Sequence, residues 1–194
     1  MLEGPVGRGP AEVSPPRGRL LRAACLLGVL IVVVLGGPLV DAALRVPVGP
    51  PLDLAPGVRL APLSGWRLAS PQRGERPALL TRGSGNLAVL SVAGGAGPDA
   101  LARQYLRAYL EPASANLVVA PAEPVLLPSG LAGARIAYRG DFDGGGRGGP
   151  LAGEVTALAS ARGTAVVFDA WALPDVYDYE REDVRSMIER AEVR

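Results

Sequence analysis

The sequence predicts an α+β fold, in which helices flank a mostly antiparallel sheet, preceded by one transmembrane helix. Three observations carry this prediction: an uncharged apolar stretch near the amino terminus, strand-like segments joined by short glycine-containing turns, and two segments with the apolar period of a helix. Strands joined by hairpins run antiparallel, and an amphipathic helix needs an apolar surface to cover. A sandwich of sheet and helices follows from these patterns.

Residues 20–40 form the predicted transmembrane helix. From Ala23 to Val40 the chain carries no charge, and two leucines before Arg22 extend the apolar run. At about 1.5 Å per residue, such a helix crosses a hydrocarbon core roughly 30 Å thick. Three arginines lie within the six residues before Ala23, and only Arg45 follows closely. We therefore expect a single-pass plasma-membrane anchor with a cytoplasmic amino terminus and an extracytoplasmic carboxyl-terminal domain.

A cleavable signal peptide and a lipoprotein signal are the two alternatives to a membrane anchor for this segment. A cleavable signal peptide would end after Ala42, where Val40 and Ala42 supply small or apolar residues; the apolar run exceeds the roughly 7–15 residues usual for such signals, which favours the anchor. The sequence LRAAC at Cys25 superficially resembles a lipoprotein signal. This cysteine precedes the apolar run, however, and Arg22 stands where a small or apolar residue is needed.

The segments on either side of the anchor are rich in proline. Residues 1–19 also hold several glycines and few aliphatic side chains, which predicts a disordered cytoplasmic tail. Residues 41–57 contain four prolines and predict an extended stalk. The folded extracytoplasmic domain is then expected over residues 58–194.

The first half of this domain predicts a hairpin followed by a helix. Strands are expected at Ala78–Arg82 and Asn86–Val92, joined by a Gly-Ser-Gly turn whose glycines permit positive φ. Pro98 suits the first turn of a helix, and apolar residues recur at helical spacing up to Pro112, which ends it.

Three further strands and a second helix follow. Residues 134–139 and 154–160 alternate in polarity, so each strand should have one wetter face. Residues 164–171 are apolar on both faces apart from Asp169, which predicts a central strand. Residues 179–192 carry an apolar stripe with acidic residues at the start and arginines at the end, which predicts the closing helix.

Composition excludes several function classes. Histidine is absent, and the only cysteine, Cys25, lies in the apolar segment, which removes the commonest catalytic base and the usual zinc ligands from the domain. The net charge of +1 is spread along the chain, so we expect no nucleic-acid partner. All 20 basic residues are arginine, which indicates a GC-rich, actinobacterial source.

The stretch from Asp141 to Gly149 is the most conspicuous polar segment. Asp141 and Asp143 resemble the start of a calcium loop, but Gly145 and Ala152 stand where such a loop needs oxygen ligands. A phosphate-binding loop is excluded because the lysine is missing. The segment is therefore expected to be a flexible hairpin loop, with neither metal nor cofactor.

Acidic side chains are the remaining candidates for catalysis. A buried Asp169 could act as a general acid, but a single carboxylate is insufficient, and we expect Asp169 to pair with Arg135 or Arg139 across the sheet. Glu154 with Arg139 is judged in the same way. An enzyme would require two carboxylates that converge in one cleft.

Aromatic side chains are the candidates for partner or ligand binding. Most are expected in the core. Tyr177 and Tyr179 are the exceptions, because they flank the last helix in an acidic turn that we expect to be exposed, where aromatic residues often anchor partners. Trp66 and Trp171 complete the set of candidates.

The order of elements resembles the PsbP-like α/β/α fold. The resemblance covers residues 58–193 and rests on Gly65-Trp66, the hairpin into NLAVLSV, the helix PDALARQYLRAYL, a long hairpin, and the closing VVFDAW and VRSMIERAEV. It implies a domain that binds or stabilises partners, as that family does; no site residue transfers. The chain also resembles membrane-anchored actinobacterial proteins of unknown function.

We therefore expect a non-enzymatic accessory or interaction module for an envelope protein assembly. A module that binds a small molecule or lipid is the alternative.

Overall fold

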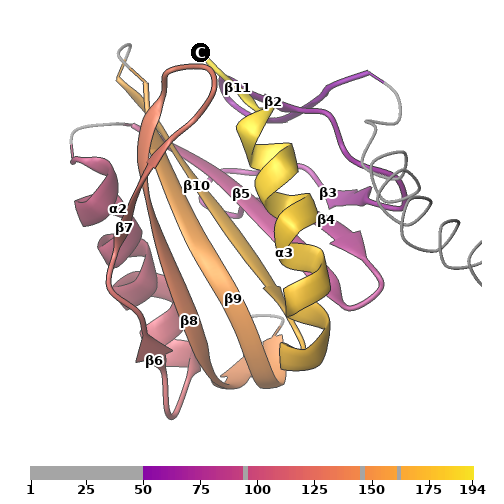
Figure 1. The fold of residues 1–194 in the computed structure, drawn as a ribbon, viewed down its shortest axis with the longest axis vertical. Helices are drawn as coiled ribbons and strands as arrows, with labels where there is room; N and C mark the ends of the chain where they lie inside the picture. The colour runs from indigo at the N-terminus through magenta and orange to yellow at the C-terminus, as the bar shows by residue number, and fades with distance from the viewer. Residues whose placement is uncertain (1–49, 94–95, 145–146, 161–162) are drawn as a thin grey trace, which may run out of the picture. The chain divides into compact units, whose positions relative to one another are not determined.

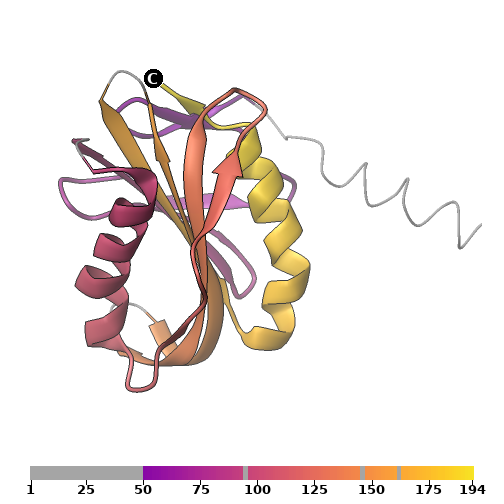
Figure 2. The same ribbon diagram turned by 60° about the vertical axis from the view of Figure 1, so that its left-hand side comes forward.

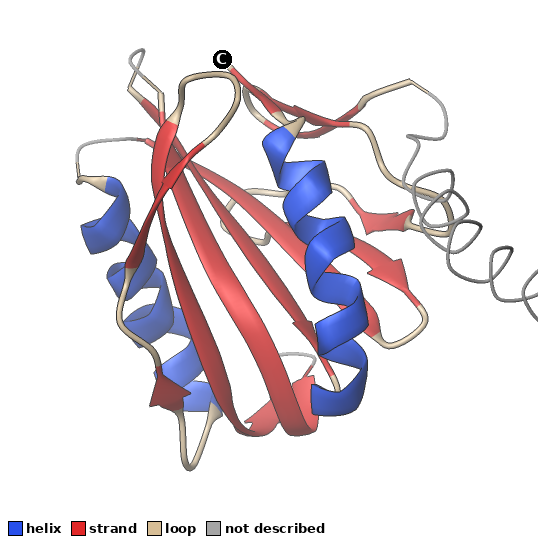
Figure 3. Ribbon diagram, viewed as in Figure 1, coloured by secondary structure: helices blue, strands red, loops and turns tan. Residues whose placement is uncertain are grey.

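The structure is a computed structural model that describes residues 50–93, 96–144, 147–160 and 163–194. An eight-stranded sheet forms its centre, and every strand pair in it is antiparallel. Along the sheet the order is β3 (Arg67–Ser70), β4 (Ala78–Arg82), β5 (Gly85–Ala93), β10 (Thr164–Ala172), β9 (Arg147–Ala159), β8 (Ala132–Gly144) and β6 (Val118–Val119), with β7 (Glu123–Leu126) also paired to β8. Figures 1 and 3 show this arrangement. The predicted antiparallel sheet is confirmed.

The central position of β10 is also confirmed. This strand lies between β5 and β9, and its side chains from Ala165 to Ala172 are all buried. Odd-numbered residues of β10 face one apolar cluster and even-numbered ones face another, as the two-residue period of a strand requires. The neighbouring β9 is buried on both faces over Leu151–Leu158, so its predicted wetter face is wrong. A helix covers each side of it.

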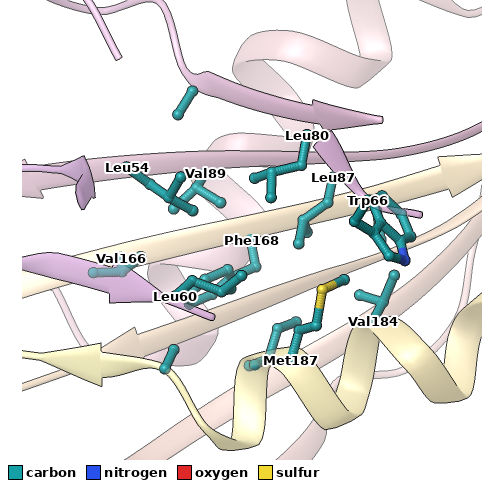
Figure 4. Close-up of a cluster of buried hydrophobic side chains, with 14 of the residues drawn as sticks. Leu54, Leu60, Trp66, Leu80, Leu87, Val89, Val166, Phe168, Val184 and Met187 are labelled. Atoms are coloured by element: carbon teal, nitrogen blue, oxygen red, sulfur yellow. The ribbon is translucent and has the colours of Figure 1, made fainter. Parts of the chain in front are cut away.

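One helix packs on each face of the sheet (Figure 2). On one face lies α2 (Pro98–Tyr105), which continues into the π-helical turn η1 (Leu106–Leu110) and the 3-10 turn η2 (Glu111–Ala113). On the other lies α3 (Pro174–Glu189), beside a three-stranded sheet of β1 (Leu52–Ala55), β2 (Val58–Leu60) and β11 (Glu192–Val193). Figure 4 shows Phe168 of β10 among Leu60 and Met187 from these elements.

The expected stalk over residues 41–57 is corrected where the structure describes it. Leu52–Ala55 is strand β1, which pairs with β2, and Leu54 is buried in the core. The prolines that suggested an extended stalk flank this strand instead of interrupting it. The fold therefore begins before the predicted boundary at residue 58. The predicted tail (1–19) and transmembrane helix (20–40) lie outside the described residues.

The expected flexible loop over residues 141–149 is wrong where the structure describes this segment, and residues 145–146 lie outside the described ranges. Strands β8 and β9 continue as a ladder through the pairs Asp141↔Pro150, Phe142↔Gly149 and Asp143↔Gly148. Phe142 anchors this end of the hairpin, because its side chain is buried in the cluster beneath α2. Glycine suggested a loop here, but a glycine can pair in a ladder when its neighbours are anchored.

The closing helix begins five residues earlier than predicted. Pro174 stands in its first turn, where its missing N–H costs nothing. Within the part of the chain that the structure describes, no helix has both the length and the apolar character needed to cross a membrane.

Candidate functional site

Asp169 is fully buried on the α2 face of β10 and is held by three side chains. Tyr105 of α2 donates a hydrogen bond to its Oδ2 at 2.9 Å, and Tyr138 of β8 donates to its Oδ1 at 2.7 Å. Arg147 of β9 forms an ion pair with Oδ2. The prediction that Asp169 pairs with an arginine holds, but the arginine is Arg147 and neither Arg135 nor Arg139.

The guanidinium of Arg147 completes this buried network. It donates a second hydrogen bond, 2.7 Å long, to the Tyr138 hydroxyl oxygen. Its Cζ lies 3.8 Å from the ring centroid of Trp171 and 5.6 Å from that of Phe142, which are favourable positions for a cation over aromatic faces. Trp171, a predicted binding candidate, is therefore occupied by an internal cation.

The network raises the pKa of its tyrosines and its arginine. Burial raises the pKa of Tyr105 and Tyr138 above the ordinary tyrosine value, and the charge of Asp169 adds to the effect. Burial alone would lower the pKa of Arg147, but the charge of Asp169, the two tyrosines and the hydrogen bond to Asp169 together outweigh burial, and the pKa rises. Asp169 thus ties α2, β8, β9 and β10 together, and its hydrogen-bonded ion pair fits a structural role better than that of a general acid.

The opposite face of the sheet carries a groove beside α3. In Figure 1, the floor is the part of β8 and β9 seen between α3 and the β6–β7 edge. The groove has a volume of about 340 Å³. Residues 118–121 and Glu123 form one wall, and side chains of α3 form the other. We call this the arginine groove, because it is lined by Arg135, Arg139, Arg181 and Arg185.

Glu154, on the floor of the groove, holds two of these arginines in place. Its carboxylate is buried, with Oε1 2.7 Å from Nε of Arg135 and Oε2 accepting a 2.6 Å hydrogen bond from Nη2 of Arg185. The hydrogen bond with Glu154 raises the pKa of Arg185 above its ordinary value despite partial burial. The expected pairing of Glu154 with Arg139 is wrong, because Arg139 lies too far along β8, opposite Ala152.

The other two arginines have much of their binding capacity free. Arg139 is exposed and has no side-chain hydrogen bond or ion pair with any residue that the structure describes. Arg181 reaches Asp178 only at 3.8 Å through Nη1, and its Nε is buried without a hydrogen-bond partner. Guanidinium groups bind carboxylates and phosphates through paired N–H donors. The groove thus offers two guanidinium groups with free N–H donors beside two that share the Glu154 carboxylate.

A second hollow of about 250 Å³ adjoins the arginine groove. Val118 and Arg139 line both spaces, so the two meet at these residues. The second hollow extends to Asn116, Asp141 and Pro174 at the start of α3. Asn116 donates to a carboxylate oxygen of Asp141 at 2.7 Å and accepts from its backbone N–H, which fixes this end.

The four predicted aromatic candidates are not brought together. Trp66 lies in the core cluster beneath α3, and Trp171 packs on Arg147 on the other face. Tyr179 is 82% exposed on α3, as predicted. Tyr177 is only 6% exposed, which corrects its expected exposure. Because α3 begins at Pro174, Tyr177 falls on the same inward stripe as Val184 and Ile188, and it lines the arginine groove.

Sequence reasoning missed the arginines that make the groove. The sequence did contain a signal. One face of β8 carries Arg135, Ala137 and Arg139, and the final helix carries Arg181 and Arg185 one turn apart. Nothing local indicated that these two faces meet. Across the described ranges, no group of three or more acidic side chains is placed to hold a metal ion.

Comparison with known proteins identifies the fold. No protein-family model matches the chain, and no curated protein sequence matches it. The solution structure of cyanobacterial PsbP (CyanoP) from Synechocystis sp. PCC 6803 is similar, with a TM-score of 0.54, 12% identity, and coverage of 71% of this chain and 87% of that one. The domain therefore has a PsbP-like fold, which confirms the resemblance at the level of fold.

Two further solved structures are also similar to this chain. LpqN, described as involved in cell envelope biogenesis of Mycobacterium tuberculosis, gives a TM-score of 0.48 at 15% identity, covering 76% of this chain and 89% of LpqN. PA94, a protein of unknown function from Pseudomonas aeruginosa, gives a TM-score of 0.41 at 13% identity, covering 68% of this chain and 88% of PA94.

Proposed function

We propose that this chain is a membrane-anchored, extracytoplasmic and non-enzymatic module that serves an envelope protein assembly by binding an anionic group in the arginine groove. The observation that carries the proposal is the pair of available guanidinium groups, Arg139 and Arg181, beside two arginines held in place by Glu154. The lining holds four arginines against the carboxylates of Glu123, Glu154 and Asp178. This excess of positive charge favours binding of an anionic group.

The described carboxylates support a binding role over catalysis. Asp169 and Glu154, which are the buried ones among the described residues, are each paired with arginine, and they lie on opposite faces of the sheet. A pair of carboxylates that shares one cleft is needed for acid and base roles in histidine-free hydrolysis. The anchor in this proposal rests on the uncharged segment over residues 20–40.

Site-specific crosslinking in native membranes tests the proposal. A photoreactive p-benzoylphenylalanine replaces Val119, which lines the groove, in the full chain. A specific crosslinked protein is expected, and its yield should fall when Arg139 and Arg181 are changed to alanine. The matched control places the same group at Arg107, which is exposed on the α2 side. Equal crosslinks from both positions, or a yield independent of the two arginines, would contradict the proposal.

Binding of a small molecule is the second candidate, and the size of the groove favours it. A volume of about 340 Å³ falls at the lower end of the roughly 300–1,000 Å³ typical of ligand sites. A small anion that co-purifies with the full chain, and is lost from the Arg139→Ala variant, would support this candidate in place of a protein partner.

A further inference from the structure

We infer that the occupant of the arginine groove is an extended, acidic segment of a partner protein, about five residues long, that lies along α3. This inference rests on the proposed function and specifies the ligand of the same site. Its first support is that the groove and the second hollow adjoin, since Val118 and Arg139 line both. We call the two spaces together the channel.

The length of the channel matches an extended peptide. Residues of α3 from Pro174 to Arg185 line it. Eleven helical steps at about 1.5 Å each span roughly 16 Å. An extended chain advances about 3.3 Å per residue, so about five residues cover this distance. A single inorganic anion would occupy only one part of the channel.

The wall chemistry specifies which side chains this segment carries. Arg139 lies where the two hollows meet, and Arg181 lies on the α3 wall, so acidic side chains at separate positions can each meet a guanidinium. The opposite wall exposes apolar side chains next to Glu123: Val118 is 70% exposed and Val119 is 38% exposed. Apolar side chains between the acidic ones would cover these valines. The segment therefore alternates acidic and apolar residues.

The segment binds in the channel and does not extend the sheet. The outer edge of β8 is already occupied by β6 and β7, and between these two strands Ala120 N–H donates a hydrogen bond to the Ala137 carbonyl of β8. Pro121 and Pro124 lie on this outer segment and have no N–H to donate to an added strand. Side-chain contacts within the channel must therefore supply the affinity.

Fluorescence anisotropy with labelled peptides tests the inference on the full chain in dodecyl maltoside micelles. The probes are peptides of one, three and five residues that alternate aspartate and valine, and a neutral five-residue peptide with asparagine in place of aspartate. Affinity should rise from three to five residues by about fivefold or more, since each added charged contact contributes a further factor of about five. The neutral peptide should not bind measurably.

Variants locate the bound peptide. The substitutions Arg139→Ala and Arg181→Ala should each lower the affinity for the five-residue peptide by about fivefold. Pro150→Trp places a large side chain in the second hollow. It should lower the affinity for the five-residue peptide to that for the three-residue peptide, and it should leave the affinity for the three-residue peptide unchanged. Arg103→Ala is the control, because Arg103 is exposed on α2 and pairs with Asp99 at the other face of the sheet.

Three outcomes would overturn the inference. If inorganic phosphate or free aspartate displaces the probe at the same concentration as the five-residue peptide, the groove binds small anions, and only the proposed anion binding survives. Arg139-dependent binding to phosphatidylglycerol vesicles, without peptide binding, assigns the groove to a lipid surface instead. If peptide, phosphate and vesicles all fail to bind, both the inference and the anion-binding role of the groove are wrong.

Discussion

The ring of Tyr138 lies directly over Gly153, its partner across the β8–β9 ladder. A Cβ atom at position 153 would stand 2.4 Å from Cζ of Tyr138 and 2.4 Å from the Ala170 carbonyl oxygen. Only a residue without a side chain lets the Tyr138 hydroxyl reach Asp169 across the next strand. The close approach of backbone and ring at Gly153 is therefore a condition for the buried network.

Gly153→Ala should lower the free energy of unfolding by about 2–3 kcal/mol, the cost typical of overpacking a rigid core. Gly148→Ala is the matched control, since it lies in the same strand with no atom within 4 Å of an added Cβ and without positive φ. Urea unfolding followed by tryptophan fluorescence reports on the domain, because both tryptophans are buried in it. Equal stability of the two variants would show that Tyr138 does not lie over Gly153.

Arg147→Met should destabilise the domain by roughly 3–5 kcal/mol, because it leaves the Asp169 carboxylate buried without its cation. The double variant Arg147→Met with Asp169→Leu should recover part of this loss, since no uncompensated charge remains. Arg103→Met removes only an exposed ion pair with Asp99 and should cost less than about 1 kcal/mol. The same denaturation measurement compares them; a double variant no more stable than the single one would contradict the argument.

Three buried tyrosines should make the domain less stable at alkaline pH. Burial raises the pKa of Tyr105, Tyr138 and Tyr177 in the folded state, whereas the unfolded chain ionises near pH 10. Their contribution is therefore fully present below about pH 10 and is lost as the pH rises above it, with a slope of up to about 1.4 kcal/mol per pH unit for each tyrosine. Unfolding free energies measured from pH 8 to 12 should fall above pH 10, and Tyr105→Phe should reduce the slope. A slope unchanged by that substitution would be inconsistent with a buried, protonated Tyr105.

Tyr177 and Tyr179 should behave oppositely, although they are two residues apart. Tyr177→Ala should cost roughly 3–5 kcal/mol, the range for deleting a buried aromatic ring. Tyr179→Ala should change stability by no more than about 0.5 kcal/mol, because its ring is exposed. Thermal unfolding of both variants provides the test, and a similar loss from each would place Tyr179 in an interface.

Glu154→Gln should strengthen anion binding while weakening the fold. The substitution removes the negative charge that holds Arg135 and Arg185, so the affinity of the groove for the five-residue acidic peptide should rise by roughly threefold to tenfold. The free energy of unfolding should fall by about 1–3 kcal/mol, because two arginines lose a charged partner. Anisotropy titration and denaturation measure the two effects separately. Unchanged or weaker peptide binding would mean that the anion does not meet these arginines.

Much of the architecture could be predicted from local patterns. The hairpin from Ala78 into β5 followed from a glycine turn between alternating strands, and Gly83 has the expected positive φ of 57°. The central position of β10 followed from its apolar character on both faces. Prolines account for two differences at the ends of elements. Those around β1 are typical of an extended stalk, yet they flank a strand, and Pro174 begins α3 five residues before the apolar stripe predicts.

The candidate site was harder to predict, because its residues come from separate elements. The prediction that Asp169 pairs with an arginine is correct, but its partner Arg147 belongs to a stretch whose glycines are typical of a loop. Because β8 and β9 pair as far as Gly144 and Arg147, the side chain of Arg147 lies on the α2 face of the sheet and reaches Asp169. The length of a hairpin depends on anchors such as Phe142, which local composition does not reveal.

The sequence alone determined the order of the elements, their antiparallel pairing and the absence of histidine and lysine, because periodicity, turn chemistry and composition are local properties of the chain. Tertiary structure decided which arginine neutralises which carboxylate, that Tyr177 is buried while Tyr179 is exposed, and that the faces of β8 and α3 form one groove. The physical reason is that ion pairing and burial depend on strand register and on which part of a sheet a helix covers. Both are set by contacts between residues far apart in the chain.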